Sequence, residues 1–199
     1  TFNFILYVDK QPVFVDTGVS TYEKNALRQS ERSTSSHNTV QIGNAEQTQV
    51  WGGFRVAKRA KIISLCEEDG LEATHDGYKS IGVEHTRKFD MHTNTIFIKD
   101  TFSKKTKEQQ IAYFHLHPAI NDILIENSKV SIKDKKIELN FTGENVLVER
   151  VNYRFAAGFN KQSVPSALPG QWVDGDFVRF RYTAPEKIGG WQQLTQANE

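Results

Sequence analysis

The stretch that decides the fold class is VSIKDKKIELNF, residues 130–141. Apolar and polar residues alternate before the turn at 134–136, and they alternate again after it. The apolar positions are Val130, Ile132, Ile137, Leu139 and Phe141. Alternation with a period of two puts one set of side chains on a buried face and the other set in water, as in antiparallel sheets. The stretch therefore predicts two antiparallel strands with one apolar and one wet face.

Short runs of the same kind fill most of the chain. They are FNFILYV (2–8), PVFV (12–15), NTVQIG (38–43), FRVAKRAKIISL (54–65), GLEATHD (70–76), KSIGVEHTRKF (79–89), NTIFIKDTF (94–102), QQIAYFHLHP (109–118), DILIEN (122–127) and NVLVERVNYRF (145–155). One short segment, TYEKNALRQ (21–29), is the exception and predicts a helix. Many strands at short spacing are typical of a β-sandwich or a barrel, so we expect an all-β, antiparallel fold.

Composition and charge argue against a nucleic-acid-binding protein and against a protein with a membrane-spanning helix. The chain has 199 residues, of which 38% are hydrophobic and 25% charged, and this is enough for one ordinary core. The formal net charge of +1 gives no broad basic surface, so we expect no nucleic-acid partner. No apolar run reaches the ~20 residues of a membrane-spanning helix. The single cysteine, Cys66, excludes an internal disulfide and fits any compartment.

A change in composition near residue 160 suggests a domain boundary. The segment NKQSVPSALPGQ (160–171) is rich in proline, serine and glycine, as linkers are. We therefore divide the chain into a β domain (1–160), a linker (161–171) and a tail of uncertain origin (172–199). Alternation from Phe177 to Arg181 predicts a strand in the tail. The tail also resembles a segment of tailed-bacteriophage structural proteins, so a native extension and a join with unrelated sequence both stay open.

The run RSTSSHNTVQIG (32–43) places a histidine between a polar loop and an alternating strand. Asp16 stands at the end of an earlier strand, so both side chains lie at sheet edges, where they can converge. A carboxylate and an imidazole suit a divalent metal such as zinc, although two ligands are fewer than a tight site uses. The alternative is structural. Asp16 then accepts backbone N–H groups in a turn, and His37 forms hydrogen bonds within its loop.

Residues 1–160 resemble the C-terminal β-sandwich domain of the heparinase II/III family, whose relatives include alginate lyases. The resemblance rests on several motifs that follow one another in the family's order. They are FNFILYVDKQPVFVDTG (2–18), STYEKNALRQSERSTSSHNTVQIGNAEQ (20–47), WGGFRVAKRAKI (51–62), HDGY (75–78) and EHTRKF (84–89). The resemblance implies that the fold is an antiparallel β-sandwich with a short β-like tail.

The resemblance also implies a metal site. In the family a His-x-His segment precedes the strand that here begins at Thr1; its first histidine acts as a catalytic base and its second as a zinc ligand. Asp16 and His37 match the other two ligands. The chain would then be N-terminally truncated and hold half of a zinc site. The α/α-toroid domain, which carries the family's catalytic tyrosine, asparagine and histidine, would precede this chain.

The activity that the resemblance implies is that of a polysaccharide lyase. Such enzymes cleave acidic, uronate-containing glycans, including glycosaminoglycans and alginate, by β-elimination. A base removes the proton α to the uronate carboxyl group, and an acid protonates the leaving oxygen. We assign no catalytic residue within this chain and expect it to be inactive alone. A periplasmic or secreted location fits the family.

Six side chains are candidates for binding an acidic glycan, because aromatic rings stack on sugars and guanidinium groups pair with carboxylates. They are Tyr22, Arg32, Trp51, Arg55, His85 and Arg87. Five of the six have a structural alternative. Tyr22 and Arg32 lie in a polar loop, Trp51 and Arg55 could pack at the start of a strand, and for Arg87 the sequence favours a solvated charge.

Three further histidines accompany these candidates. His75 and His85 belong to neighbouring strands and are expected to meet across a hairpin. His115 and His117 share one face of a strand at a spacing that permits chelation, although a surface pair is the favoured interpretation. If no metal binds, Trp51, Arg55 and Arg87 would form the sugar-binding face of a non-catalytic carbohydrate-binding or scaffolding domain. A third possibility, a phage structural fragment, rests on the tail alone.

Overall fold

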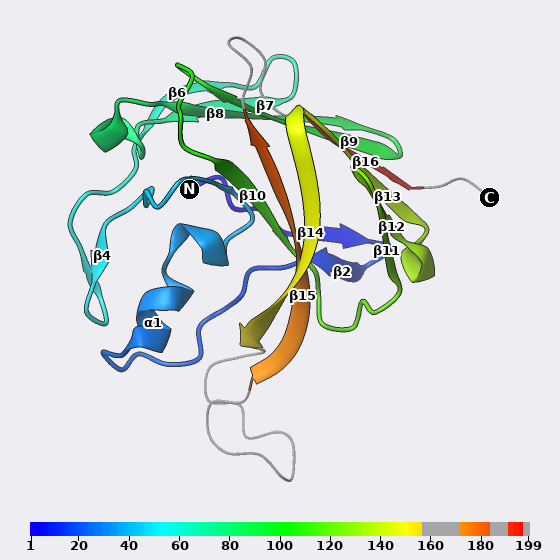
Figure 1. The fold of residues 1–199 in the computed structure, drawn as a ribbon, viewed down its shortest axis with the longest axis horizontal. Coiled ribbons are helices and arrows are strands. Elements are labelled where there is room, and N and C mark those ends of the chain that lie inside the picture. Colours follow the sequence, from blue (N-terminus) through cyan, green and yellow to red (C-terminus); the bar gives the residue numbers. More distant parts are fainter. Residues whose placement is uncertain (157–171, 184–190, 197–199) are drawn as a thin grey trace.

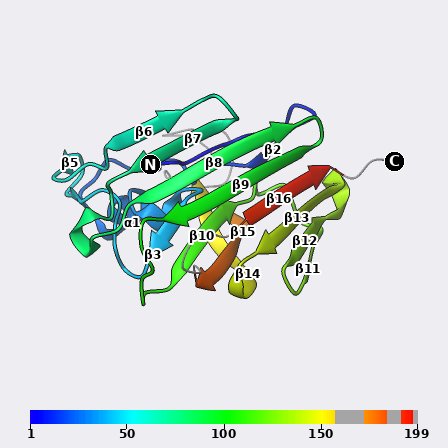
Figure 2. The ribbon, with the colours of Figure 1, turned by 90° about the horizontal axis from the view of Figure 1, so that it is seen from above.

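A computed structural model describes residues 1–156, 172–183 and 191–196 of the chain, and their strands form two main antiparallel sheets (Figure 1). The larger sheet has eight strands. In spatial order they are β11 (Ile123–Glu126), β12 (Lys129–Ile132), β13 (Ile137–Thr142), β16 (Trp191–Gln196), β9 (Thr95–Phe102), β8 (His85–His92), β7 (Leu71–His75) and β6 (Ile62–Cys66). Figure 2 shows this sheet from above, with β6 and β11 at its two edges.

The smaller sheet has four strands. They are β14 (Glu144–Ala156), β15 (Trp172–Thr183), β10 (Gln110–His115) and β3 (Val40–Ile42). Two short hairpins complete the described strands: β1 (Leu6–Val8) with β2 (Gln11–Phe14), and β4 (Val50–Trp51) with β5 (Arg55–Val56). The described helices are the α-helix α1 (Ala26–Glu31) and the single-turn 3-10 helices η1 (Thr34–Ser36), η2 (Lys79–Ile81) and η3 (Lys133–Lys135). No described helix has the length and apolar character needed to span a membrane.

The core confirms the prediction from residues 130–141. Strands β12 and β13 pair in register through Val130↔Leu139 and Ile132↔Ile137, and all four of these side chains are buried. They join one cluster with residues of both sheets and of the N-terminal segment, among them Phe114 of β10. Because the apolar faces of the two sheets pack against each other, the fold is an antiparallel β-sandwich.

Strand pairing places the described part of the tail inside both sheets. β15 lies between β14 and β10, and its predicted segment Phe177–Arg181 pairs with both neighbours. β16 lies between β13 and β9. The linker predicted for residues 161–171 lies outside the described residues. The phage resemblance of the tail stays a prediction.

One expected strand is interrupted. The run at residues 54–65 was expected to be continuous, but residues 57–61 are not in a strand, and β5 and β6 belong to different sheets. The interruption contains Lys58, Arg59 and Lys61, all of which are exposed. Residues 57–61 are therefore a basic segment that connects the two sheets.

Candidate functional site

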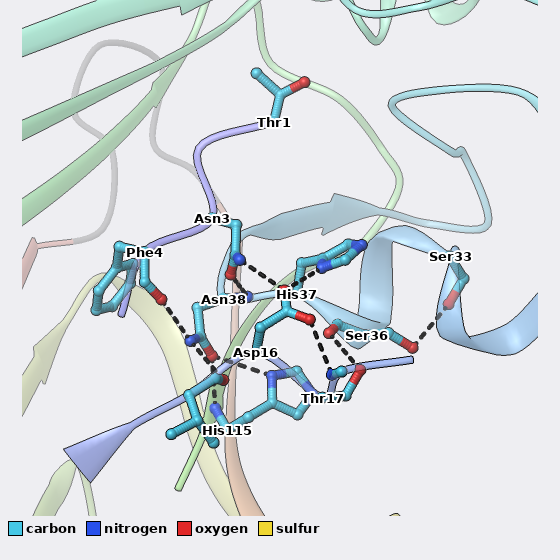
Figure 3. Close-up of polar contacts among 12 residues, drawn as sticks. Thr1, Asn3, Phe4, Asp16, Thr17, Ser33, Ser36, His37, Asn38 and His115 are labelled. Carbon is cyan, nitrogen blue, oxygen red and sulfur yellow. Dashed lines mark hydrogen bonds and ion pairs between the residues drawn. The ribbon is translucent and has the colours of Figure 1, made fainter. Parts of the chain in front are cut away.

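Asp16 and His37 meet at the end of the sandwich where β2 leaves the core and β3 begins (Figure 3). The Asp16 Oδ2 and His37 Nδ1 atoms are 2.7 Å apart, and Oδ2 also accepts a hydrogen bond of 2.7 Å from Asn3 Nδ2. Both side chains are about one-third exposed. Burial alone would raise the pKa of the Asp16 carboxyl, but the hydrogen bond from His37 and its charge lower it below its usual value. The pair is therefore a polar site at the surface with an ionised carboxylate.

Asp16 also acts as a turn residue, as its structural alternative predicted. Its Oδ1 atom accepts the backbone N–H of Gly18 at 3.0 Å, which is an Asx-type turn. Gly18 has a φ of +80°, and a Cβ atom there would lie 2.6 Å from the carbonyl oxygen of Ala156. The turn thus lies against the end of β14 and fixes the carboxylate, so that Oδ2 faces His37.

Asn38 holds the loop that carries His37. Its side chain is fully buried and donates to the carbonyl oxygens of Phe4 and Val15 at 2.8 and 3.0 Å. Its Oδ1 atom accepts the backbone N–H of His115 at 2.7 Å and lies 3.0 Å from that histidine's Nδ1 (Figure 3). Asn38 therefore connects three parts of the chain: the N-terminal segment, Val15 after β2, and β10. It thereby sets the position of the adjacent His37.

A pocket of about 310 Å³ opens beside Asp16 and His37. Its wall includes two guanidinium groups, Arg28 and Arg32, and also Thr1. Arg28 lies over the ring of Tyr22 at 5.2 Å, although Tyr22 itself does not line the pocket. Glu31 lines the pocket as well and pairs with Arg28 at 3.6 Å. The wall thus combines two carboxylates and an imidazole with two guanidinium groups, which can form hydrogen bonds with a polar, charged ligand.

Four of the six predicted glycan-binding residues gather around the β4–β5 hairpin. Arg32 donates to the carbonyl oxygens of Gly52 and Arg55, at 3.1 Å each, and so ties the hairpin to the end of α1. Tyr22 packs on Phe54 with a ring separation of 5.4 Å. Trp51, Phe54 and Arg55 line a second pocket at the tip, of about 510 Å³. Trp51 and Phe54 are 56% and 70% exposed, so the tip presents two aromatic faces to solvent.

The other two predicted residues, His85 and Arg87, lie in the interior. The solvated charge that the sequence favours for Arg87 is wrong, because this side chain is only 1% exposed. Its guanidinium donates to both carboxylate oxygens of Asp100, at 2.7 and 2.9 Å. It also donates to the carbonyl oxygens of Phe2 and Asn38 at 3.0 and 2.7 Å. Arg87 therefore joins the N-terminal segment to the loop that carries His37.

His75 and His85 meet across β7 and β8, as predicted, and they continue the same buried network. The Gly77 N–H donates to His75 Nδ1, so the proton of His75 is on Nε2, which faces His85 Nδ1 at 3.1 Å. His85 then donates from Nε2 to Asp100 at 2.7 Å. This directed chain of hydrogen bonds fixes both rings as neutral Nε2–H tautomers.

Burial explains the charges in this network. Desolvation lowers the pKa of His75 to about 2 and also lowers that of His85, although the Asp100 charge acts in the opposite direction on both rings. Burial alone would raise the pKa of Asp100, but Arg87 and His85 hold it well below its usual value. This network thus combines the Arg87–Asp100 ion pair with two neutral imidazoles.

The interpretation of His115 and His117 as a surface pair is wrong for His115. Its side chain is 1% exposed, bonded to Asn38, and desolvation lowers its pKa to about 3. His117 remains partly exposed and accepts the backbone N–H of Ala119. Sequence reasoning also missed Asn38, Asn3 and Asp100. A signal was present for Asp100 in the alternating run IFIKDTF (96–102). It shares a strand face with Ile98 and Phe102, so a buried carboxylate could have been expected there.

The donor chemistry of the Asp16–His37 pair fits zinc, but the number of ligands falls short. Carboxylate oxygen and imidazole nitrogen are both common zinc ligands, and a structural site takes four. In the part of the chain that the structure describes, no group of three or more histidine, cysteine, aspartate or glutamate residues is arranged to hold a metal. The pair is thus at most one half of such a site.

Comparison with known families decides the classification. The family model for the heparinase II/III-like C-terminal domain matches residues 1–183. The chain belongs to the heparinase II/III family. The match includes β15. No curated protein matches the sequence.

Solved structures show the same fold. A heparinase III with methylated lysines is 13% identical, with a TM-score of 0.73, and the match covers 99% of this chain. The heparan sulfate lyase HepC from Pedobacter heparinus is 12% identical, with a TM-score of 0.70 over 99% of this chain. The chain spans 30% of the length of each of these structures. Less than a third of each of these structures is therefore matched.

Proposed function

We propose that this chain is the β-sandwich domain of a polysaccharide lyase that cleaves uronate-containing glycans by β-elimination. The observation that carries the proposal is the Asp16–His37 pair on the wall of a pocket that also holds Arg28 and Arg32. Membership of the heparinase II/III family supports it, and so does the fold shared with a heparan sulfate lyase. In this role the domain would supply one wall of the substrate cleft, and a second domain would supply the catalytic acid and base.

The chemistry explains why a cationic wall would help. Removal of the proton α to the uronate carboxyl group leaves negative charge on that carboxyl group, and nearby positive charge stabilises it. Arg32, whose guanidinium is anchored to two backbone carbonyl oxygens, and Arg28, which Glu31 partly neutralises, would orient the glycan's carboxylate. Because no acid–base pair is assigned within the chain, we expect the domain alone to be inactive.

We further propose that Asp16 and His37 are ligands of a zinc ion in the longer protein. Thr1 lines the same pocket, so a segment joined before Thr1 would begin at its wall. A bound zinc ion would supply positive charge at the cleft. Measuring metal content tests this without an activity assay. A longer protein that includes the preceding segment should hold one zinc ion, Asp16→Asn and His37→Gln should each lose it, and His92→Gln should keep it. Full metal content in both site variants would contradict the proposal.

The lyase proposal has a direct assay. The longer protein is incubated with heparan sulfate and, separately, with alginate, and the unsaturated product is followed by its ultraviolet absorbance. We expect product from at least one uronate glycan and none from the 199-residue chain alone. Absence of product from every uronate glycan would refute the activity, whereas product from the chain alone would refute its inactivity. A periplasmic or secreted location is part of the same proposal and is tested by fractionating the native cells.

The exposed aromatic tip of the β4–β5 hairpin supports a second candidate, a non-catalytic carbohydrate-binding domain. Trp51 and Phe54 offer flat apolar faces, and Arg55 stands beside them in the same pocket. Isothermal titration of the isolated chain with heparan sulfate oligosaccharides tests this candidate. Binding that is lost in Trp51→Ala but kept in Asp16→Asn, together with an inactive longer protein, would favour it over the lyase.

A further inference from the structure

The edge strand β6 is unusually apolar for its position. Ile62, Ile63 and Leu65 are 50%, 50% and 59% exposed, and Cys66 is exposed as well. Figure 2 shows β6 at the rim of the larger sheet, and among the described residues no strand pairs with its outer side. Edge strands are commonly protected by charges, proline or bulges. β6 contains neither a charge nor proline, and its one irregularity lies between Ile62 and Ser64.

The segments that flank β6 carry opposite charges. The preceding segment has Lys58, Arg59 and Lys61, and the turn that follows has Glu67, Glu68 and Asp69. All six of these residues are exposed. If two copies of β6 pair antiparallel around Ser64, Lys61 of each copy lies opposite Glu67 of the other, and Arg59 lies opposite Asp69. A parallel pairing would instead bring like charges together.

We propose that β6 is a docking edge for a second copy of this chain. The two β6 strands pair antiparallel about a twofold axis through Ser64 and join the two larger sheets into one. Backbone hydrogen bonds across the axis satisfy the free edge, and Ile63 of each copy packs across from Leu65 of the other. The charged ends fix the register and exclude the parallel arrangement. The contact uses the same patch on both copies, so it closes as a dimer.

Sedimentation equilibrium of the 199-residue chain tests the proposal. We expect a dimer at micromolar concentration. Leu65→Lys should weaken the dimer at least tenfold, because it places a charge in the new contact while leaving the core untouched. The matched control is Met91→Lys, which changes another exposed apolar residue (72% exposed) and should have no effect. A chain that stays monomeric at several hundred micromolar, or equal weakening by both variants, would overturn the proposal.

A charge-exchange experiment tests the register. In Arg59→Glu/Lys61→Glu both ends of β6 are acidic, and in Glu67→Lys/Asp69→Lys both ends are basic. Each double variant alone should be monomeric at concentrations where the native chain is dimeric. An equimolar mixture of the two should form a heterodimer, since opposite charges again face each other at both ends. If the native chain dimerises but the mixture stays monomeric, the dimer uses a different surface and the proposed pairing is wrong.

Discussion

Lowering the pH should strongly destabilise this domain already at pH values where its carboxylates are still ionised. His75, His85 and His115 are each at most 1% exposed, and burial lowers the pKa of all three. Unfolding returns each imidazole to its ordinary pKa of about 6.5. Between the folded and unfolded values the unfolded chain binds more protons, so stability is present above about pH 6.5 and is lost as the pH falls.

The magnitude follows from the number of buried imidazoles. Each one that stays neutral in the fold costs about 1.4 kcal/mol of stability when the pH falls from about 7.5 to about 5.5. His75 and His115, with pKa values lowered to about 2 and about 3, account for two such contributions. His85, which is bonded to Asp100 through its only ring proton, adds a third. We therefore expect a loss of about 3–4 kcal/mol in the free energy of unfolding.

Urea unfolding followed by circular dichroism at the two pH values measures this loss. His115→Gln should reduce the pH-dependent difference by about 1.4 kcal/mol, whatever it does to stability at neutral pH. His92 is the control, because its side chain is 59% exposed and its removal should leave the difference unchanged. A difference below about 1 kcal/mol in the native chain, or an equal reduction by His92→Gln, would refute the conclusion that buried neutral imidazoles control stability.

Three further predictions use the same unfolding assay. Asp100→Asn should cost about 3–5 kcal/mol, because it leaves the buried Arg87 guanidinium without its counterion; a loss below 1 kcal/mol would contradict that role. Gly18→Ala should cost about 1–2 kcal/mol, because φ is +80° and the new Cβ would lie 2.6 Å from a carbonyl oxygen; an unchanged midpoint would show that the turn relaxes freely. Deletion of residues 161–199 should abolish cooperative unfolding, because it removes the inner strand β15 from the smaller sheet and the inner strand β16 from the larger sheet. An unchanged transition would show that the tail does not contribute to the stability of the fold.

Local alternation predicted the fold class well, because in a half-buried sheet apolar residues face the core and polar residues face water in turn along each strand. Residues 130–141 show this, since all five apolar positions are buried. Alternation carries no information about which strands are neighbours. The placement of β15 between β14 and β10 therefore could not be predicted from residues 172–183 alone.

The site was harder to predict, because its polar residues depend on partners far away in the sequence. Arg87 resembles a solvated charge until Asp100 is known to lie beside it, and His115 resembles a surface ligand until Asn38 is placed. The convergence of Asp16 and His37 was predicted from their positions at the ends of strands, and the two side chains do meet. Pairing across strands, rather than residue type, decided each of these cases.

The order of strands within the two sheets has a consequence for biosynthesis. β15 and β16 are the last described strands along the chain, yet each occupies an inner position, between β14 and β10 in one sheet and between β13 and β9 in the other. A ribosome releases them after all of their neighbours. Until then, neither sheet is continuous, and β14, β10, β13 and β9 each have one unpaired edge on the nascent chain. The domain can therefore complete its fold only after β16 has left the ribosome, and the four edges need protection from other chains during that interval.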